Sequence, residues 1–151
     1  MKNVICSLAS TFLCFTAFMD AATVEGDRFK QSEKAVKLAT YGHVDAKGLK
    51  SLLDSHVPLT LLDARGNNWN DGNIIPGAQL ASHEFSPEEL DQIIPNFDSL
   101  VVIYCYSFTC PLTPWLAAKL VKLGYTNIIE YPGGLTEWRD IAKYPVKAIY
   151  R

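Results

Sequence analysis

Short apolar runs alternate along this chain with segments whose apolar residues recur at helical spacing. An uninterrupted apolar run of about four to eight residues is typical of a strand that is buried on both faces. Three such runs stand at Leu59–Asp63, Ser99–Cys105 and Asn127–Tyr131. The alternation predicts a single α/β domain, with a central parallel sheet, right-handed crossovers and helices on both faces.

Clear start signals precede the first two helical segments. Asp45 stands before an apolar-periodic stretch and is the expected N-cap of a helix that ends before Pro58. Farther along, Ser86 is an N-cap candidate and Glu89 completes a capping box with it. This second helix is expected to run to about Ile94, where the following proline stops it.

The other two helices are predicted after the second and third strands. Thr113 is the expected N-cap of a helix that has Pro114 at its first position. Gly124 follows the last apolar position of that helix and is expected to end it. A final helix is predicted over residues 135–142, after a turn that contains two glycines.

The start of the chain has a different pattern. Lys2 is followed by an uncharged, largely apolar stretch over residues 3–19, and then by small residues. This order is typical of a secretory signal peptide, and the stretch is shorter than the ~20 residues that span a bilayer. We expect a signal peptide at 1–22, an N-terminal extension or linker at 23–39 and the domain at 40–151. The protein would then be exported, to the periplasm or outside the cell; an uncleaved membrane anchor is the alternative.

Composition and charge narrow the classes of partner. The chain has 151 residues, of which 20% are charged and 48% hydrophobic, as in ordinary soluble globular domains. Its formal net charge is -2, and no cluster of lysine or arginine marks a nucleic-acid surface. We therefore expect no nucleic-acid partner, and no membrane contact once the leader is removed.

Removal of the leader changes the cysteine count. Cys6 and Cys14 would leave with it, so the exported chain keeps Cys105 and Cys110. A close pair can form a disulfide in an oxidising compartment, but so short a loop gains little stability from closure. The pair therefore favours reactive chemistry over reinforcement. Cys110 is interpreted as a resolving thiol, a structural disulfide partner or a bystander.

Cys105 ends a predicted strand, just before a predicted helix. Ligands of open parallel sheets bind beyond the carboxyl ends of the strands, and a helix N-terminus stabilises a nearby thiolate. This favours a nucleophilic Cys105, although an inert core cysteine is the plain alternative. A zinc site built from the pair with His43, His56 or His83 is disfavoured, because the histidines are scattered. No metal and no cofactor are expected.

Four segments, in order, resemble one family. Asp63–Arg65 ends a strand as Asp-x-Arg, and Gly72–Ala78 resembles the Gly-His-Ile-Pro-Gly-Ala signature of rhodaneses. Val101–Cys105 resembles the strand that delivers the rhodanese cysteine, and Leu116–Trp138 resembles the helix, strand and Gly-Gly-x-x-x-Trp segment that follow it. The resemblance covers about 110 residues, from Tyr41 to the end of the chain.

The resemblance implies a sulfurtransferase. Cys105 would take sulfane sulfur from thiosulfate or polysulfide as a persulfide and pass it to a thiol or to cyanide. Its partners would be a small sulfur-containing anion or a protein thiol. Asp63 and Arg65 would support the site, with Arg65 near its mouth, although a purely structural ion pair is the alternative. The substrate loop would comprise Tyr106, Ser107, Phe108, Thr109 and Thr113.

The loop departs from the family pattern, Cys-x-x-Gly-x-Arg-Ser. It is two residues longer, and it lacks both the glycine and the arginine. Without that cation a doubly charged donor such as thiosulfate is held less well. Pro111 and Pro114 remove two amides from the anion cradle. Two other functions therefore stay open: a thiol–disulfide redox protein that uses both cysteines, and a non-catalytic rhodanese-like binding module.

Overall fold

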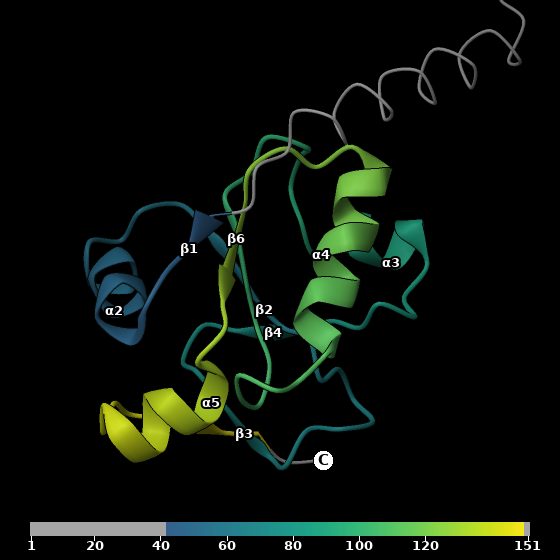
Figure 1. Ribbon diagram of the computed structural model, residues 1–151. Helices are drawn as coiled ribbons and strands as arrows, with labels where there is room; N and C mark the ends of the chain where they lie inside the picture. The colour runs from purple at the N-terminus through teal and green to yellow at the C-terminus, as the bar shows by residue number, and fades with distance from the viewer. Residues whose placement is uncertain (1–41, 150–151) are drawn as a thin grey trace, which may run out of the picture.

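A parallel sheet forms the centre of the domain (Figure 1). The computed structural model describes residues 42–149, and within them a five-stranded sheet has the order β1-β6-β5-β2-β4. All four neighbouring pairs of strands are parallel. The predicted α/β class with a central parallel sheet is thus confirmed. The strands are β1 (Gly42–His43), β2 (Thr60–Asp63), β4 (Gln79–Leu80), β5 (Val101–Tyr104) and β6 (Ile128–Tyr131).

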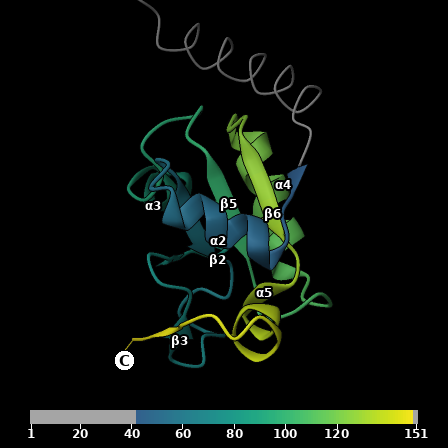
Figure 2. The ribbon, with the colours of Figure 1, turned by 90° about the vertical axis from the view of Figure 1, so that its left-hand side faces the viewer.

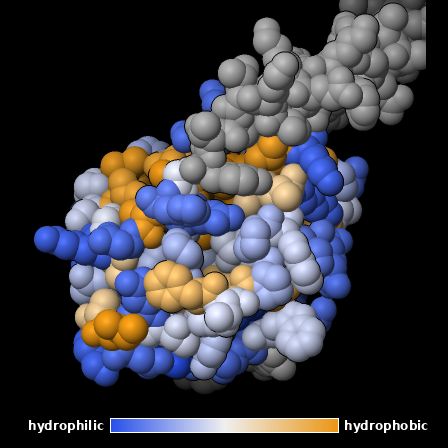
Figure 3. Space-filling model, viewed as in Figure 1, coloured by the Kyte–Doolittle hydropathy of each residue, from blue (hydrophilic) through white to orange (hydrophobic). Residues whose placement is uncertain are grey.

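Helices cover both faces of the sheet, as the alternation predicted (Figures 1 and 2). On one face lie α3 (Pro87–Asp91) and α4 (Leu112–Leu123); on the other lie α2 (Ala46–Asp54) and α5 (Gly134–Thr136). A single π-helical turn, η1 (Glu137–Ile141), continues α5. The face drawn in Figure 3 is largely hydrophilic, with apolar groups among the polar ones. Many of the apolar side chains are instead buried in two layers beside the sheet.

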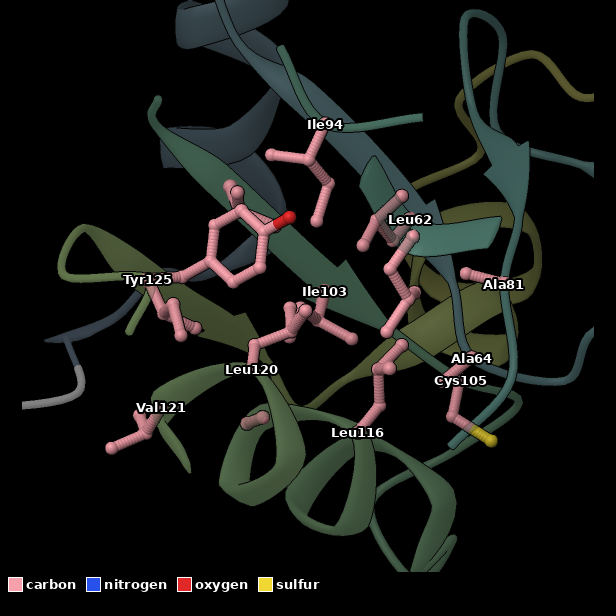
Figure 4. Close-up of a cluster of buried hydrophobic side chains, with 14 residues drawn as sticks. Leu62, Ala64, Ala81, Ile94, Ile103, Cys105, Leu116, Leu120, Val121 and Tyr125 are labelled. Atoms are coloured by element: carbon pink, nitrogen blue, oxygen red, sulfur yellow. The ribbon is translucent and has the colours of Figure 1, made fainter. Parts of the chain in front are cut away.

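The central strand β5 supplies side chains to both layers. Val101, Ile103 and Cys105 pack in the layer under α4, whereas Val102 and Tyr104 pack in the layer under α2. Successive side chains of a strand point to opposite faces, so a strand with two buried faces must be apolar at every position. This is the physical reason for its unbroken apolar run. Figure 4 shows the α4 layer, with Cys105 at its edge beside Ala64 and Leu116.

Helix boundaries differ from the prediction at α3 and α4. The Ser86–Glu89 capping box is present, but α3 ends at Asp91 rather than near Ile94. Helix α4 begins at Leu112 after Pro111, so Thr113 is not its N-cap but a buried residue of its first turn. Pro114 then occupies the third helical position, where the backbone N–H needs no partner within the helix. Proline is tolerated throughout the first turn, and its presence therefore did not fix the first helical residue.

The last helix keeps its predicted extent but not its pitch. It starts at Gly134, and the N–H of Ala142 donates to the carbonyl of Glu137 at 2.8 Å, the five-residue step of a π turn. Such a bulge is not encoded in apolar spacing. The short strands β3 (Asn73–Ile74) and β7 (Lys147–Ala148), which pair antiparallel, were also not predicted. Two residues are too few to show a period.

The predicted leader and linker, residues 1–39, lie outside the described residues. Within 42–149 the longest helix is α4, and none of the helices there is long and apolar enough to cross a membrane.

Helix α4 is expected to depend on the layer beneath it. Leu116 is fully buried there, and Leu116→Ala should lower the free energy of unfolding by roughly 2–5 kcal/mol, because it leaves a cavity. Urea unfolding at constant slope measures this loss. The exposed neighbour Ala118 is the control: Ala118→Gln should change stability by less than about 0.5 kcal/mol. Equal effects of the two substitutions would contradict this packing.

Candidate functional site

Cys105 lies one residue beyond β5, at the carboxyl edge of the sheet. The parallel register sets Asp63, the last residue of β2, beside Tyr104, the last residue of β5. The carbonyl of Tyr104 accepts a hydrogen bond from the N–H of Ala64 at 2.8 Å. The Asp63–Arg65 motif and Cys105, 40 positions apart in the sequence, are therefore neighbours at one edge. This is where ligands of parallel α/β sheets bind.

Cys105 and Cys110 are joined by a disulfide, with a Cα–Cα distance of 6.3 Å. The N–H of Cys110 donates to the carbonyl of Ser107 at 3.0 Å, which folds the intervening loop into a turn. Cys110 is thus a disulfide partner in this state of the protein. The two cysteines differ in exposure: Cys105 is only 2% exposed, whereas Cys110 is only partly buried.

The N-terminus of α5 holds the backbone of the loop. Leu135 and Thr136 donate their N–H groups to the carbonyls of Cys105 and Tyr106, both at 2.9 Å. This close approach requires a glycine at position 134. Its φ is +62°, and a Cβ there would lie 2.6 Å from the Cys105 carbonyl oxygen. The second glycine of the predicted turn therefore positions the cysteine loop, a role that its sequence context alone did not reveal.

The Asp63–Arg65 pair is buried and densely bonded. Arg65 is 2% exposed, and its Nη2 donates to Asp63 at 2.7 Å and to the carbonyl of Asn73 at 2.6 Å. Its Nη1 donates to Asp71 at 2.9 Å. Burial is the largest single influence on the pKa of Arg65 and lowers it, but the hydrogen bonds to Asp63 and Asp71, together with the negative charge of Asp63, outweigh it and the pKa is raised. The guanidinium therefore remains charged and is engaged by carboxylates of the protein itself.

Asp71 lies between two arginines. Besides Arg65, it meets Arg139 at 3.5 Å. Burial is the largest single influence on the pKa of Asp71 and raises it, but the hydrogen bonds from Arg65 and the Asn73 N–H and the charges of Arg65 and Arg139 together outweigh it, and the pKa is lowered. The ring of Tyr106 lies 5.9 Å from the Arg65 guanidinium carbon, so the first loop residue covers this charged group.

A cleft of about 560 Å³ opens beside the disulfide. Two exposed tryptophans, Trp69 and Trp115, stand on its wall, and the ring of His83 packs edge-on against Trp115 at 5.2 Å. Glu84 is the acidic residue of the lining. Arg65 also lines the cleft, but its guanidinium is bonded to the carboxylates of Asp63 and Asp71. The lining comprises Arg65, Trp69, His83, Glu84, Cys105, Tyr106, Cys110, Pro111, Leu112 and Trp115. The cleft is therefore mostly apolar, with little net charge.

The structure brings together only part of the predicted site. Cys105, Cys110, Arg65 and Tyr106 line the cleft, and Asp63 lies behind Arg65. The other predicted loop residues do not line it: the Ser107 and Thr109 hydroxyls bond each other at 3.3 Å, Phe108 is 66% exposed, and Thr113 is buried in α4.

The sequence did not predict a place in the site for the two tryptophans, and His83 was weighed only as a zinc ligand. Trp69 stands in a Gly/Asn-rich segment and Trp115 in the first turn of α4, far apart in the sequence. Solvent-exposed tryptophans are unusual enough to signal a binding surface, but exposure is not visible in a sequence. Within residues 42–149, no group of three or more His, Cys, Asp or Glu side chains is placed to hold a metal ion.

Comparisons with known proteins agree with this fold. The family model for the rhodanese-like domain matches residues 45–141. Among solved structures, a protein from Bacillus halodurans aligns with a TM-score of 0.63 and 20% identity, over 83% of this chain and 86% of its own. A rhodanese-like domain from Anabaena sp gives a TM-score of 0.62 and 23% identity, over 73% and 81%. A rhodanese-like domain protein from Staphylococcus aureus gives 0.58 and 19%, over 72% and 99%. No curated protein matches the chain.

Gly134→Ala should displace the cysteine loop. The added Cβ meets the loop backbone, so the loss of stability should combine roughly 1–2 kcal/mol for the left-handed conformation with roughly 1–3 kcal/mol for overpacking. Gly77 is a matched control, because its φ is +86° and a Cβ there has nothing within 4 Å. Urea unfolding of both variants isolates the steric part. Equal losses in Gly134→Ala and Gly77→Ala would contradict the contact.

Arg65→Gln should destabilise the fold, because it strands the buried Asp63 carboxylate. We expect a loss of roughly 3–5 kcal/mol, as for other buried pairs that lose one partner. Arg139→Gln is the control: it removes partly exposed pairs with Asp140 and Asp71 and should cost less than about 1 kcal/mol. Thermal and urea unfolding at neutral pH measure both. Wild-type stability in Arg65→Gln would favour a substrate role for Arg65 over a structural one.

Proposed function

Because this chain belongs to the rhodanese-like domain family, we propose that it is a sulfurtransferase whose sulfur carrier is Cys105. The observation that carries the proposal is the position of this residue. Cys105 follows the central strand, lines the cleft and is bonded to Cys110, the residue before the N-cap of α4. Once reduced, its sulfur would lie near the N-terminus of a twelve-residue helix, which favours the thiolate.

The transfer begins with the Cys105 thiolate. It attacks the outer sulfur of a persulfide or polysulfide donor, the donor's S–S bond breaks, and the donor leaves as a thiolate or a shorter polysulfide. Cys105 then carries one extra sulfur as a persulfide. An acceptor thiolate or cyanide takes that outer sulfur, and Cys105 returns to its thiolate form. No electrons are gained or lost overall, because the sulfane sulfur moves with its oxidation state unchanged.

The lining of the cleft favours donors of low charge. Two unit charges in contact near a protein surface attract each other by roughly 4 kcal/mol, so binding of a dianion such as thiosulfate depends strongly on a free cation in the site. The guanidinium of Arg65 is engaged by Asp63 and Asp71, and Glu84 adds a negative charge to the wall. The apolar remainder suits a polysulfide or an organic persulfide. We therefore infer that polysulfide is a better donor than thiosulfate.

Cys110 gives the persulfide a second fate. Its thiolate attacks the inner sulfur of the Cys105 persulfide, hydrosulfide leaves, and the Cys105–Cys110 disulfide forms. The donor sulfur is thereby reduced to sulfide and the two thiols are oxidised. The disulfide seen in the structure is the product that this step would leave. Turnover would then require an external thiol to open it.

The disulfide also supports a second candidate function, that of a thiol–disulfide redox protein. In that case the cysteines exchange electrons with a partner and no sulfur is carried. The same mass measurement separates the two functions, because sulfur carriage adds an atom to Cys105 whereas redox chemistry only opens and closes the bridge.

Reduced protein treated with polysulfide should gain one sulfur atom, about 32 Da, on Cys105. We expect this adduct to persist in Cys110→Ser, because the resolving thiol is absent, and to be lost in Cys105→Ser. Intact mass and peptide mapping locate the adduct, and thiosulfate under the same conditions should load less of the protein. If the wild-type protein converts to the disulfide while Cys110→Ser gains no adduct, the redox function is favoured. No change in either measurement would leave a binding module.

A further inference from the structure

The two cysteines of the disulfide are not equally exposed. Cys105 is 2% exposed and belongs to the apolar layer between the sheet and α4. Figure 4 shows it beside Ala64 and Leu116 at the edge of that layer. Cys110 is partly exposed and packs against the same layer from outside. An attacking thiolate must contact the sulfur to which it bonds, so access decides which of the two is attacked.

The surroundings of Cys110 suit an organic thiol. Cys110 shares the wall of the cleft with Trp115, which is 53% exposed, and Trp69, which is 72% exposed, stands on the same cleft. An apolar group carried by the incoming thiol can pack against these rings. A small polysulfide needs no such surface, because it can enter the cleft without a bulky carrier.

The helix stabilises the sulfur that leaves. Cys110 immediately precedes Pro111, the N-cap of α4. Because Cys105 is bonded to Cys110, its sulfur also lies at this helix end. The partial positive charge of the helix N-terminus lowers the pKa of a thiol placed there, and a thiol of lower pKa is a faster leaving group. Departure of a Cys105 thiolate is thus favoured when Cys110 is attacked.

We propose that Cys110 is the exchange site of this protein, with Cys105 released as the leaving thiolate. An organic thiolate attacks the Cys110 sulfur, the Cys105–Cys110 bond breaks, and a mixed disulfide forms on Cys110. A second organic thiolate then attacks the outer sulfur of that mixed disulfide. Cys110 leaves as a thiolate, and the two organic thiols depart as their disulfide. Two electrons pass from the external thiols to the protein, and both cysteines end reduced.

The two cysteines of one loop then have different roles. The buried Cys105 takes sulfane sulfur from small donors, and the accessible Cys110 exchanges electrons with thiols. The inference rests on the proposed function in one respect: the released Cys105 thiolate carries sulfur only if the protein is a sulfurtransferase. The regiochemistry of disulfide opening is a separate property and is measured separately.

Mass spectrometry of oxidised wild-type protein after reaction with a thiol identifies which sulfur is attacked. The protein is mixed with glutathione, quenched in acid at short times, alkylated and fragmented between positions 105 and 110 for mass spectrometry. We expect glutathione on Cys110 with alkylated Cys105, in at least about tenfold excess over the reverse product at the earliest times, since access controls the rate. Glutathione found mainly on Cys105 would overturn the proposal.

Single-cysteine variants provide a second measurement. Reduced Cys105→Ser, which keeps Cys110, should react with the bulky reagent dithiobis(nitrobenzoate) at least about tenfold faster than reduced Cys110→Ser. Equal or reversed rates would overturn the exchange role of Cys110. Polysulfide loading of Cys105 in Cys110→Ser tests the sulfurtransferase function independently: its loss would remove that function and leave the exchange result standing.

Discussion

The parallel pairing of β5 between β2 and β6 is the constraint on which the rest of this structure depends. Parallel strands end at the same edge of a sheet, so the residues that follow them meet there whatever their separation in the sequence. Asp63 lies beside Tyr104, and Tyr104 lies beside Tyr131. The ion-paired turn after β2, the cysteine loop after β5 and the glycine turn after β6 thus converge on one site.

Charge within that site is arranged for stability more than for ligand capture. The Arg65 guanidinium is buried and bonded to Asp63 and Asp71, so its charge is neutralised inside the protein. What faces the cleft is largely aromatic and apolar. On this basis we propose that the site holds a doubly charged donor weakly and accepts organic or polysulfide sulfur more readily. The chemistry proposed for the two cysteines follows from this distribution of charge and from their unequal burial.

Much of the fold could be predicted because its signals are local. The unbroken apolar run before Cys105 indicates a strand buried on both faces, and the Ser86–Glu89 pair marks a helix start; both are present in the structure. The first residue of α4 was predicted wrongly, because Pro114 fits any position of a first turn. The π turn and the two-residue strands β3 and β7 were not predicted, because neither kind of element has a periodic pattern in the sequence.

The sequence by itself determined the parallel α/β class, the delivery of Cys105 at a strand end and the absence of a cation between Cys105 and Lys119. These follow from short-range patterns and from residue identity. Only the tertiary structure decided that Arg65 is engaged by Asp63 and Asp71, that Gly134 seats the cysteine loop, and that Trp69 and Trp115 share a cleft with the disulfide. Each of these depends on which strand lies beside which, and burial and distance exist only once the chain has folded.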